Sequence, residues 1–350
     1  TVIAARVQQR APRLDGPVQG QGVEIVETMT GTPGERFPHG RTFHHSQFPP
    51  ERIAAERRHS VSVCLPAREC AGTVGPIVRR LVELREAGVL DEVLVVDAAS
   101  RDGTAERAAA AGAIVRQEAE LLPQQGPVLG KGDALWRALS VLEGEIVCFL
   151  DADTENFSDH FATGLIGAIC CEPDVDFAKA FYRRPGPSRA AVPGGAAVPG
   201  GAAVPGGAAV PAGAERPDEG LDPDGGGRVN RLMARPLVAE LYPWLAWVHQ
   251  PLAGEVAARR ELLERLPFAT GYGVEIAMLI DVWKESGTGR IVQVDLEVHR
   301  HPHQSLSALE PMARTVLATV ARRLHEEGRL LEAPSGAPLE RPPLASLALV

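Results

Sequence analysis

Apolar residues in the first half of the chain come in unbroken runs, not in alternation with polar residues. Four such runs precede residue 151, at 61–65, 92–97, 113–116 and 146–150. A strand with this pattern is covered on both faces, as in the parallel sheet of an α/β protein. Between the runs, apolar positions recur at helical spacing over 74–84, and an alanine-rich segment spans 104–111. This order predicts right-handed β-α-β units that share one parallel sheet.

The second half of the chain carries weaker patterns. Residues 175–182 alternate imperfectly and predict a strand near the sheet edge, 247–255 predict a strand followed by a turn, and 290–298 alternate well. Pro66 is expected to end the first strand of the chain. Helical spacing and capping residues predict further helices at 157–171, 225–241, 259–266, 268–282 and 305–327.

The composition changes sharply between these two halves. From Ala190 to Gly213 the motif Ala-Ala-Val-Pro-Gly-Gly recurs with a period of six residues, and no copy carries a charge or a large side chain. Such a short period of small residues cannot build a packed solenoid core. We interpret residues 185–224 as a flexible insertion without chemistry of its own.

The composition and charge of the chain indicate which partners and which cellular compartment to expect. The chain of 350 residues is 45% hydrophobic, enough for a sizeable core, and carries a net charge of −9 with no basic stripe. These values argue against a nucleic-acid partner. The 5 cysteines lack metal-type spacing, no segment is apolar over a bilayer-spanning length, and the N-terminus lacks a signal-peptide pattern. We therefore expect a cytoplasmic protein with reduced thiols and no membrane partner.

Two carboxylates stand where the fourth apolar run ends. Asp151 and Asp153 directly follow residues 146–150, at the edge where open α/β sheets bind their ligands. Carboxylates held this close repel each other unless a cation or hydrogen-bond donors lie between them. Oxygen ligands of this kind suit Mg²⁺ or Mn²⁺, with a diphosphate completing the coordination. The alternative is a solvated turn that caps a helix starting near Phe157.

Two glycine-rich stretches each place a positively charged side chain beside backbone that a ligand can approach closely. Lys131 lies between two glycines at the start of a helix, whose N-terminus favours an anion, and residues 225–227 are three glycines before Arg228. A guanidinium at this position can form two hydrogen bonds to a phosphate or carboxylate. Each stretch has a plain alternative. Lys131 would simply be exposed on a loop, and Arg228 would form a surface ion pair beside a hinge.

Glu275 and several histidines are the remaining candidates. Glu275 lies in the first turn of a helix, where acids are common because of the helix dipole alone. The histidines of residues 299–304 follow the strand at 290–298, and they could ligate a metal or form a surface cluster. His44 and His45 are adjacent, which is a poor spacing for shared metal ligation, so we expect a surface role for them.

Nine stretches form a recognisable set. They are Val61-Ser-Val-Cys-Leu-Pro-Ala-Arg68, Val95-Val-Asp-Ala-Ala-Ser-Arg-Asp-Gly-Thr104, Gly130-Lys-Gly-Asp-Ala-Leu-Trp136, Phe149-Leu-Asp-Ala-Asp153, Lys179-Ala-Phe-Tyr-Arg-Arg-Pro185, Gly225-Gly-Gly-Arg-Val229, Gln250-Pro-Leu-Ala-Gly-Glu255, Pro267-Phe-Ala-Thr-Gly-Tyr-Gly-Val-Glu-Ile276 and His299-Arg-His301. Together they resemble the glucosyl-3-phosphoglycerate synthases, which are retaining glycosyltransferases of the GT-A fold with mannose-transferring relatives. The resemblance covers residues 43–325 apart from the repeat, and the motifs from Phe181 onward are the more specific ones.

The resemblance implies both a fold and an activity. The fold is α/β, with a GT-A, Rossmann-like nucleotide-sugar-binding sheet and a smaller C-terminal acceptor-binding part. The activity is metal-dependent transfer of a hexose, glucose first, from a nucleoside diphosphate sugar to the 2-hydroxyl of 3-phosphoglycerate by a homodimer. The corresponding organisation is a partly irregular N-terminal arm at 1–58, a nucleotide-sugar-binding half at 59–184, the insertion at 185–224, an acceptor-binding half at 225–330 and a loose tail at 331–350.

Site residues carry over from the matching motifs. Those that the resemblance places at the nucleotide sugar are Pro66, Ala67, Glu69, Asp97, Ser100, Lys131, Asp151, Ala152, Leu252 and Glu275. Those placed at the acceptor are Gly227, Arg228, Val229, Asn230 and His303. Asp153 and His301 are expected to hold the Mg²⁺ or Mn²⁺ ion. The catalytic candidates are Asp153, Glu275 and Arg228, with Arg228 anchoring the acceptor phosphate and Glu275 orienting sugar hydroxyls.

Two departures from the family pattern leave alternatives open. Glu69-Cys-Ala stands where the family commonly has Asn-Glu-Glu, and Pro302-His303-Gln304 stands where relatives have Arg-Asn-Arg. Because the first departure affects the base, a mannosyl-3-phosphoglycerate synthase that uses GDP-mannose is the first alternative. The second is a GT-A enzyme acting on a lipid phosphate, which the lack of a membrane helix or basic amphipathic segment disfavours. The third is a nucleotide-sugar sensor without catalysis.

Overall fold

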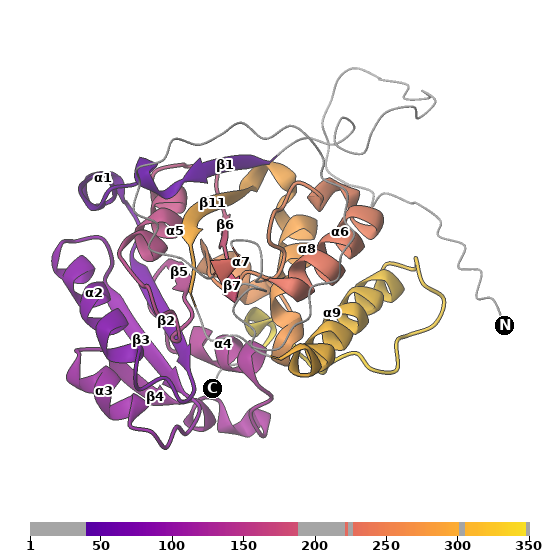
Figure 1. The fold of residues 1–350 in the computed structure, drawn as a ribbon, viewed down its shortest axis with the longest axis horizontal. Coiled ribbons are helices and arrows are strands. Elements are labelled where there is room, and N and C mark those ends of the chain that lie inside the picture. The colour runs from indigo at the N-terminus through magenta and orange to yellow at the C-terminus, as the bar shows by residue number, and fades with distance from the viewer. Residues whose placement is uncertain (1–39, 188–220, 223–226, 301–304, 348–350) are drawn as a thin grey trace, which may run out of the picture.

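The computed structural model describes residues 40–187, 221–222, 227–300 and 305–347. Its main feature is an eight-stranded sheet in the order β1-β11-β6-β9-β5-β2-β3-β4 (Figure 1). Neighbouring strands are parallel except around β9, which runs antiparallel to β5 and β6. The strands are β1 (Arg41–His44), β2 (Val61–Ala67), β3 (Glu92–Asp97), β4 (Ile114–Gln117), β5 (Ile146–Phe149), β6 (Phe177–Arg183), β9 (Val256–Arg259) and β11 (Ile291–Val298).

A hydrophobic core lies on each face of this sheet. Residues of α1, α2, α3 and α5 belong to one core, and residues of α4, α6, α7, α8 and α9 belong to the other. Val63 and Leu65 of β2 enter the first core and Cys64 the second, so burial on both faces explains the unbroken apolar runs. The helices are α1 (Pro50–Glu56), α2 (Val74–Glu86), α3 (Thr104–Ala110), α4 (Lys131–Leu139), α5 (His160–Cys170), α6 (Arg235–Leu241), α7 (Arg260–Arg265), α8 (Val274–Ser286) and α9 (Leu306–Glu326).

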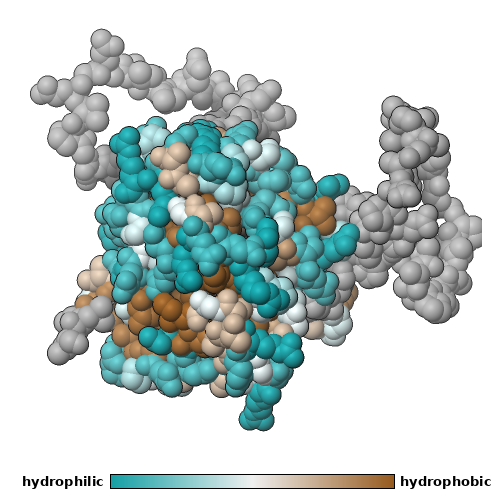
Figure 2. Space-filling view, turned by 90° about the vertical axis from the view of Figure 1, so that its left-hand side faces the viewer, coloured by the Kyte–Doolittle hydropathy of each residue, from teal (hydrophilic) through white to brown (hydrophobic). Residues whose placement is uncertain are grey.

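Polar side chains cover most of the side of the molecule that carries α2 and α3, with a broad apolar area low on that face and a smaller one toward its right side (Figure 2). In α2 the residues Val74, Ile77 and Leu81 are buried, whereas Arg79 and Arg80 are exposed. This division along one helix is the amphipathic pattern expected from its sequence. Within the described residues, no helix has the length and apolar character that a membrane span requires.

Two short antiparallel pairs lie outside the main sheet. β7 (Gly186–Pro187) pairs with β8 (Leu221–Asp222), so the two ends of the insertion run side by side. β10 (Phe268–Ala269) pairs with β12 (Glu340–Arg341) near the C-terminus. The repeat from Ala190 to Gly213 lies outside the described residues.

Three strand expectations were wrong. β6 lies inside the sheet between β11 and β9, because the second half of the chain supplies strands on both sides of it. Its single buried cation, Lys179, made the apolar run look like the alternation of an edge strand. Residues 247–255 form turns, and the strand begins at Val256. β2 continues through Pro66, which is tolerated because its pairing with β5 stops at Cys64.

The arm and the tail are more ordered than expected. Residues 41–56 of the arm form β1, a 3₁₀ turn and α1, and Phe48 is fully buried. In the tail, β12 pairs with β10 and Leu344 is buried in the second core. Neither segment was recognised because each depends on pairing with a strand far away in the sequence. The main sheet also crosses the expected boundary between the two halves, since β9 and β11 belong to it.

Candidate active site

The carboxyl ends of β2, β3, β5, β6 and β11 meet at one edge of the sheet, together with the start of the antiparallel strand β9. Such an edge is where ligands bind in open α/β folds. A pocket of about 210 Å³ is found there. Its walls are Lys131, Asp151, Asp153, Arg184, Gly227, Arg228, Val229, Asn230, Gln250, Leu252, Ala253, Gly254, Tyr272, Glu275, His299, Leu309 and Met312.

Lys131 joins two of the acidic candidates. Its Nζ lies 2.7 Å from Asp151 Oδ1 and 3.1 Å from Glu275 Oε1. Burial alone would lower the pKa of Lys131, but the charges of Asp151 and Glu275 outweigh burial and raise the pKa. Lys131 is therefore a fixed positive charge at the first residue of α4, where the backbone N–H groups also favour an anion.

Gly254 leaves the space that this ion pair needs. A Cβ at residue 254 would lie 2.5 Å from Lys131 Nζ and 2.9 Å from both carboxylate oxygens of Asp151. Any larger residue would therefore have to displace the pair. The glycine in the motif that ends at Glu255 is thus explained by close packing, not by backbone conformation.

The Asp153 side chain is accessible from the pocket, although neighbouring protein atoms exclude much of the solvent around its carboxylate. Desolvation raises the pKa of Asp153, and the negative charge of Asp151 raises it further. A divalent cation would stabilise the neighbouring negative charges of Asp151 and Asp153, so these carboxylate oxygens fit Mg²⁺ or Mn²⁺. His301, the second expected metal ligand, and His303 lie outside the described residues.

A buried polar network that was not expected includes His299, which lines the same pocket as Asp153. Glu255 is 1% exposed, with Oε1 2.9 Å from His299 Nε2 and Oε2 accepting a 2.7 Å hydrogen bond from Tyr182. Arg184 in turn donates to the Tyr182 hydroxyl at 2.6 Å. Burial would raise the pKa of Glu255, but His299 and its other partners outweigh burial and lower the pKa. Glu255 therefore holds the His299 ring in place at the pocket wall.

The loop at 250–254 is fixed from two sides. Lys179, which is 1% exposed, donates from Nζ to Ala253 O at 2.8 Å. Burial lowers the pKa of Lys179 to about 8, although the charges of Glu275 and Glu255 oppose this shift. On the other side, Leu252 N donates to Asn230 Oδ1 at 3.3 Å. Asn230 thus links the expected acceptor loop to the loop that carries Leu252, which is expected at the donor sugar.

The residues expected at the nucleoside form a neighbouring group at the ends of β2 and β3. Glu69 N donates to Ser100 Oγ at 2.9 Å, and Ser100 N donates to Asp97 Oδ2 at 3.0 Å. The carboxylate of Glu69 accepts from Arg101 N at 2.9 Å, and the φ angles of Glu69 and Ala99 are 52° and 54°. These contacts show that Glu69 and Ser100 shape the two loops through hydrogen bonds.

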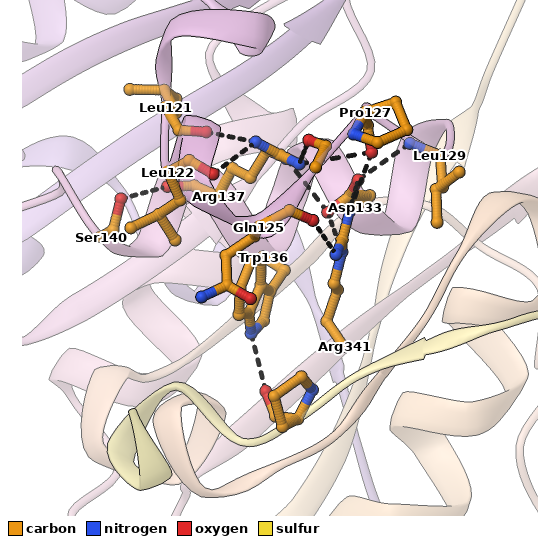
Figure 3. A network of polar contacts seen from close by, with 12 residues as sticks. Leu121, Leu122, Gln125, Pro127, Leu129, Asp133, Trp136, Arg137, Ser140 and Arg341 are labelled. Carbon is orange, nitrogen blue, oxygen red and sulfur yellow. Dashed lines mark hydrogen bonds and ion pairs between the residues drawn. The ribbon is translucent and has the colours of Figure 1, made fainter. Parts of the chain in front are cut away.

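The C-terminal tail braces the start of α4 (Figure 3). Asp133 is fully buried and receives two hydrogen bonds from Arg341, at 2.7 and 2.8 Å, and one from Arg137 at 3.2 Å. Arg341 also donates to Gln125 O at 2.6 Å and to Pro127 O at 2.9 Å. The tail therefore orders both the helix that carries Lys131 and the loop that precedes it.

The structure unites most, but not all, of the expected residues. Those that line one pocket are Lys131, Asp151, Asp153, Gly227, Arg228, Val229, Asn230, Leu252 and Glu275. Those outside it, at the neighbouring strand ends, are Pro66, Ala67, Glu69, Asp97, Ser100 and Ala152. Residues that the sequence reasoning missed are Tyr182, Arg184, Gly254 and Glu255, and His299 was considered only as one of a histidine cluster. The available signal was their place in the family-specific motifs that flank β6, β9 and β11.

Comparison with known proteins first defines the class. Residues 62–193 match the profile of glycosyl transferase family 2. A glucosyl-3-phosphoglycerate synthase of Petrotoga mobilis is 37% identical over 296 residues, which are 83% of this chain and 82% of that protein. One from Mycobacterium tuberculosis H37Rv is 39% identical over 273 residues, which are 78% of this chain and 76% of that protein. The chain therefore belongs to the glucosyl-3-phosphoglycerate synthase family.

Solved structures of relatives share the fold. Mannosyl-3-phosphoglycerate synthase from Rubrobacter xylanophilus is 40% identical, with a TM-score of 0.72 and coverage of 88% of this chain and 96% of that chain. Mycobacterium tuberculosis glucosyl-3-phosphoglycerate synthase in complex with Mn²⁺, UDP-glucose and phosphoglyceric acid is 34% identical, with a TM-score of 0.70 and coverage of 88% and 99%. The expected glycosyltransferase α/β fold is confirmed.

Proposed function

We propose that this protein transfers glucose from UDP-glucose to the 2-hydroxyl of 3-phosphoglycerate, with Mg²⁺ or Mn²⁺ as cofactor. Six relatives named glucosyl-3-phosphoglycerate synthase are 37% to 40% identical, and a structure of one such enzyme contains Mn²⁺, UDP-glucose and phosphoglyceric acid. The observation that carries the proposal is the shared pocket. The Lys131–Asp151–Glu275 cluster and the loop Gly227–Asn230 line the same space of about 210 Å³.

The charges in the pocket suit two anionic substrates. Lys131 and the N-terminus of α4 favour the diphosphate of the donor, and Arg228 favours the phosphate or carboxylate of the acceptor. Asp153 would hold the cation, which as a Lewis acid stabilises the negative charge on the leaving diphosphate. Holding both substrates in one pocket also supplies the proximity that transfer requires.

Transfer breaks the bond between glucose C1 and the diphosphate oxygen and forms a bond between C1 and the acceptor oxygen. Asp151 and Glu275 both contact Lys131. We propose that neither forms a covalent bond to the sugar. The proposed attack is from the face of the leaving diphosphate, which takes the acceptor proton and retains the configuration at C1. Glu275 is proposed to orient sugar hydroxyls, and a glycosyl group trapped covalently on Glu275 would contradict this assignment.

A donor and acceptor panel tests the proposal. The purified chain is incubated with Mn²⁺, 3-phosphoglycerate and UDP-glucose, GDP-glucose, UDP-mannose or GDP-mannose, and products are identified by mass spectrometry. We expect glucosyl-3-phosphoglycerate from UDP-glucose and no product in EDTA. Product only from GDP-mannose would favour mannosyl transfer, which the 40% identity to the Rubrobacter xylanophilus enzyme keeps as the second candidate. Activity only with lipid phosphates, or UDP-glucose binding without turnover, would refute both.

The assembly and compartment are proposed as well. The family resemblance suggests a homodimer, and light scattering at several protein concentrations would test it. The 5 cysteines are all free thiols, with Cys64 and Cys148 buried. Free thiols suit the reducing cytoplasm, which we propose as the compartment.

A further inference from the structure

Three metal-binding side chains outside the catalytic pocket converge at the edge of the sheet that carries β1. His45 Nε2 lies 3.2 Å from Glu297 Oε1, and His44 Nε2 lies 3.6 Å from the same oxygen. One ligand atom from each residue lies within 4.8 Å of the other two. None of the three residues lines the pocket that contains Asp153. The two adjacent histidines therefore meet the same carboxylate, an arrangement that their spacing did not predict.

The turn after β1 and a bulge in β11 bring these residues together. β1 pairs in parallel with β11, with His44 opposite Asp295, and a 3₁₀ turn begins at His45. The pairing of β11 with β6 shifts register between Asp295 and Val298. Glu297 lies in this bulge with a φ angle of 63°, a left-handed conformation that is uncommon for residues other than glycine. The backbone is thus strained at the residue whose carboxylate meets both rings.

Neighbouring groups hold both rings in position. His44 Nδ1 lies 2.8 Å from Ser46 Oγ and accepts a hydrogen bond from Ser46 N at 3.3 Å, so Ser46 fixes the ring at Nδ1 while Nε2 lies beside Glu297. His45 packs closely on α5, because a Cβ at Gly164 would lie 3.0 Å from the His45 Cβ. The ring of His45 also lies 4.4 Å from the ring of His160, measured between centroids. Little reorganisation is therefore needed for the two Nε2 atoms to bind one ion.

We propose that His44, His45 and Glu297 bind a divalent transition-metal ion, Zn²⁺ in the first place. Ligands at about 2.0–2.1 Å in a tetrahedron around zinc lie about 3.3 Å apart. The separations of 3.2 and 3.6 Å from Glu297 Oε1 are close to this value. Two imidazoles and a carboxylate are a common zinc ligand set, with water in the fourth position. The His44 and Glu297 side chains are 43% and 52% exposed, so the ion has access from solvent.

The bound ion would fasten β1 to β11. β1 is the edge strand of the sheet, and β11 leads within two residues of Glu297 to His299 at the catalytic pocket. A ligand that binds only the folded state stabilises that state by mass action. Zn²⁺ is therefore expected to raise the melting temperature. A simple ion pair between protonated imidazoles and Glu297 would give no such response to Zn²⁺.

The test uses the full chain without a polyhistidine tag, stripped of metal by a chelator. Zn²⁺ alone is titrated by calorimetry, and melting temperatures are measured with and without it. We expect the wild type to bind one more Zn²⁺ than His44→Ala or Glu297→Gln, and the rise in melting temperature at this site to be lost in both variants. Asp153→Ala should still bind Zn²⁺ at His44, His45 and Glu297, because these residues lie outside the catalytic pocket.

His59→Ala is the matched control. His59 Nδ1 lies 3.2 Å from Glu145 Oε1, which is a similar pair without a second histidine, so its loss should leave the Zn²⁺ stoichiometry unchanged. Circular dichroism confirms that each variant is folded, and Glu297→Gln, which preserves size, decides the test if His44→Ala does not fold. Unchanged Zn²⁺ stoichiometry in Glu297→Gln, or no Zn²⁺ bound outside the Asp153 site in the wild type, would overturn the proposal.

Discussion

Asp153 is the side chain in the pocket from which we expect the largest loss of activity. Asp153→Ala should lower kcat by at least about 100-fold, because stabilisation of transition-state charge by a positioned group is typically of this size. Its pKa is raised, so protons compete with the metal at a higher pH than for an ordinary aspartate. Mn²⁺ binding should therefore weaken as the pH falls. Steady-state kinetics and Mn²⁺ titrations at several pH values check both effects.

The exposed Glu155, two residues further on, provides the control for this substitution. Glu155→Ala removes a carboxylate that does not line the pocket, so Mn²⁺ affinity and kcat should stay at the wild-type level. Wild-type Mn²⁺ affinity in Asp153→Ala would show that this aspartate does not hold the metal.

A single methyl group tests the packing of the Lys131–Asp151 pair. In Gly254→Ala the added carbon would lie 2.5 Å from Lys131 Nζ, so the ion pair has to move. Displacements of about 1 Å in a catalytic site can cost about 100-fold in rate, and we expect a 10- to 100-fold loss in kcat/KM for the nucleotide sugar. Gly289→Ala is the control, because nothing lies within 4 Å of a Cβ there. Equal kinetics of the two variants would contradict the assignment.

Arg228 separates acceptor binding from donor binding. Hydrogen bonds to charged groups contribute about 1.5–3 kcal/mol, so Arg228→Ala should lower kcat/KM for 3-phosphoglycerate by about 10- to 100-fold. UDP binding, measured by calorimetry, should stay the same. Arg231→Ala is the control, since Arg231 is exposed and does not line the pocket. An equal loss of UDP affinity in Arg228→Ala would show that the acceptor assignment is wrong.

Elements that are buried on both faces were predictable, and elements that depend on distant pairing were not. β2, β3 and β5 begin at the expected residues because uninterrupted apolar runs have few alternatives. β6 was predicted at the sheet edge because Lys179 interrupts its apolar run. Lys179 is nevertheless buried, because it donates a hydrogen bond to Ala253 O, and such a tertiary contact leaves no periodic pattern in the sequence. β12 has only two residues, and its stability depends on β10 and on the contacts of Arg341.

The tail is expected to support the nucleotide-sugar site through Arg341. Arg341→Ala removes two hydrogen bonds from the buried Asp133 and two from the loop before α4. Breaking a largely buried ion pair costs about 3–5 kcal/mol, and Arg137 still pairs with Asp133, so we expect a loss of about 2–4 kcal/mol in unfolding free energy. The KM for UDP-glucose should rise, because the loop before α4 and the helix that carries Lys131 lose the hydrogen bonds that hold them in position.

Denaturant unfolding and donor kinetics check the two parts of this prediction. Arg265→Ala is the control, because Arg265 and Glu285 form an exposed pair at 3.8 Å that should contribute less than about 1 kcal/mol. Loss of stability with an unchanged KM for UDP-glucose would limit the tail to a structural role.

At the scale of the whole molecule, the site could be predicted where parallel strands end and where glycines adjoin a cation. Asp151 and Asp153 were found because carboxyl ends of parallel strands share one edge, and Lys131 and Arg228 because glycines beside them mark an anion site. Glu255 was missed because β9 runs antiparallel, which places the start of this strand at the same edge. Its partner His299 follows β11, and no spacing in the sequence shows that these two strand ends meet. The buried network is therefore a product of the tertiary fold.

Deletion of residues 190–213 tests whether the repeat matters to the whole molecule. The backbone enters and leaves the insertion through the β7–β8 pair, in which Gly186 lies opposite Asp222 and Pro187 opposite Leu221. Because these ends already run side by side, a shorter loop can close without moving the sheet. The deletion shortens the connection between β7 and β8 nearly fourfold, which changes its closure free energy by only about 1 kcal/mol in favour of folding. The melting temperature should therefore not fall, and kcat/KM should stay within about twofold.

A Gly-Ser segment of equal length in place of 190–213 separates the length of the repeat from its composition. The melting temperatures of the deletion and of the replacement should be close to that of the parent chain, because neither change alters the two hydrophobic cores. A lower melting temperature in both would show that the repeat packs on the described fold. Unchanged melting with a higher KM for 3-phosphoglycerate would instead connect the repeat to the acceptor loop, since Gly227 lies three residues after the insertion.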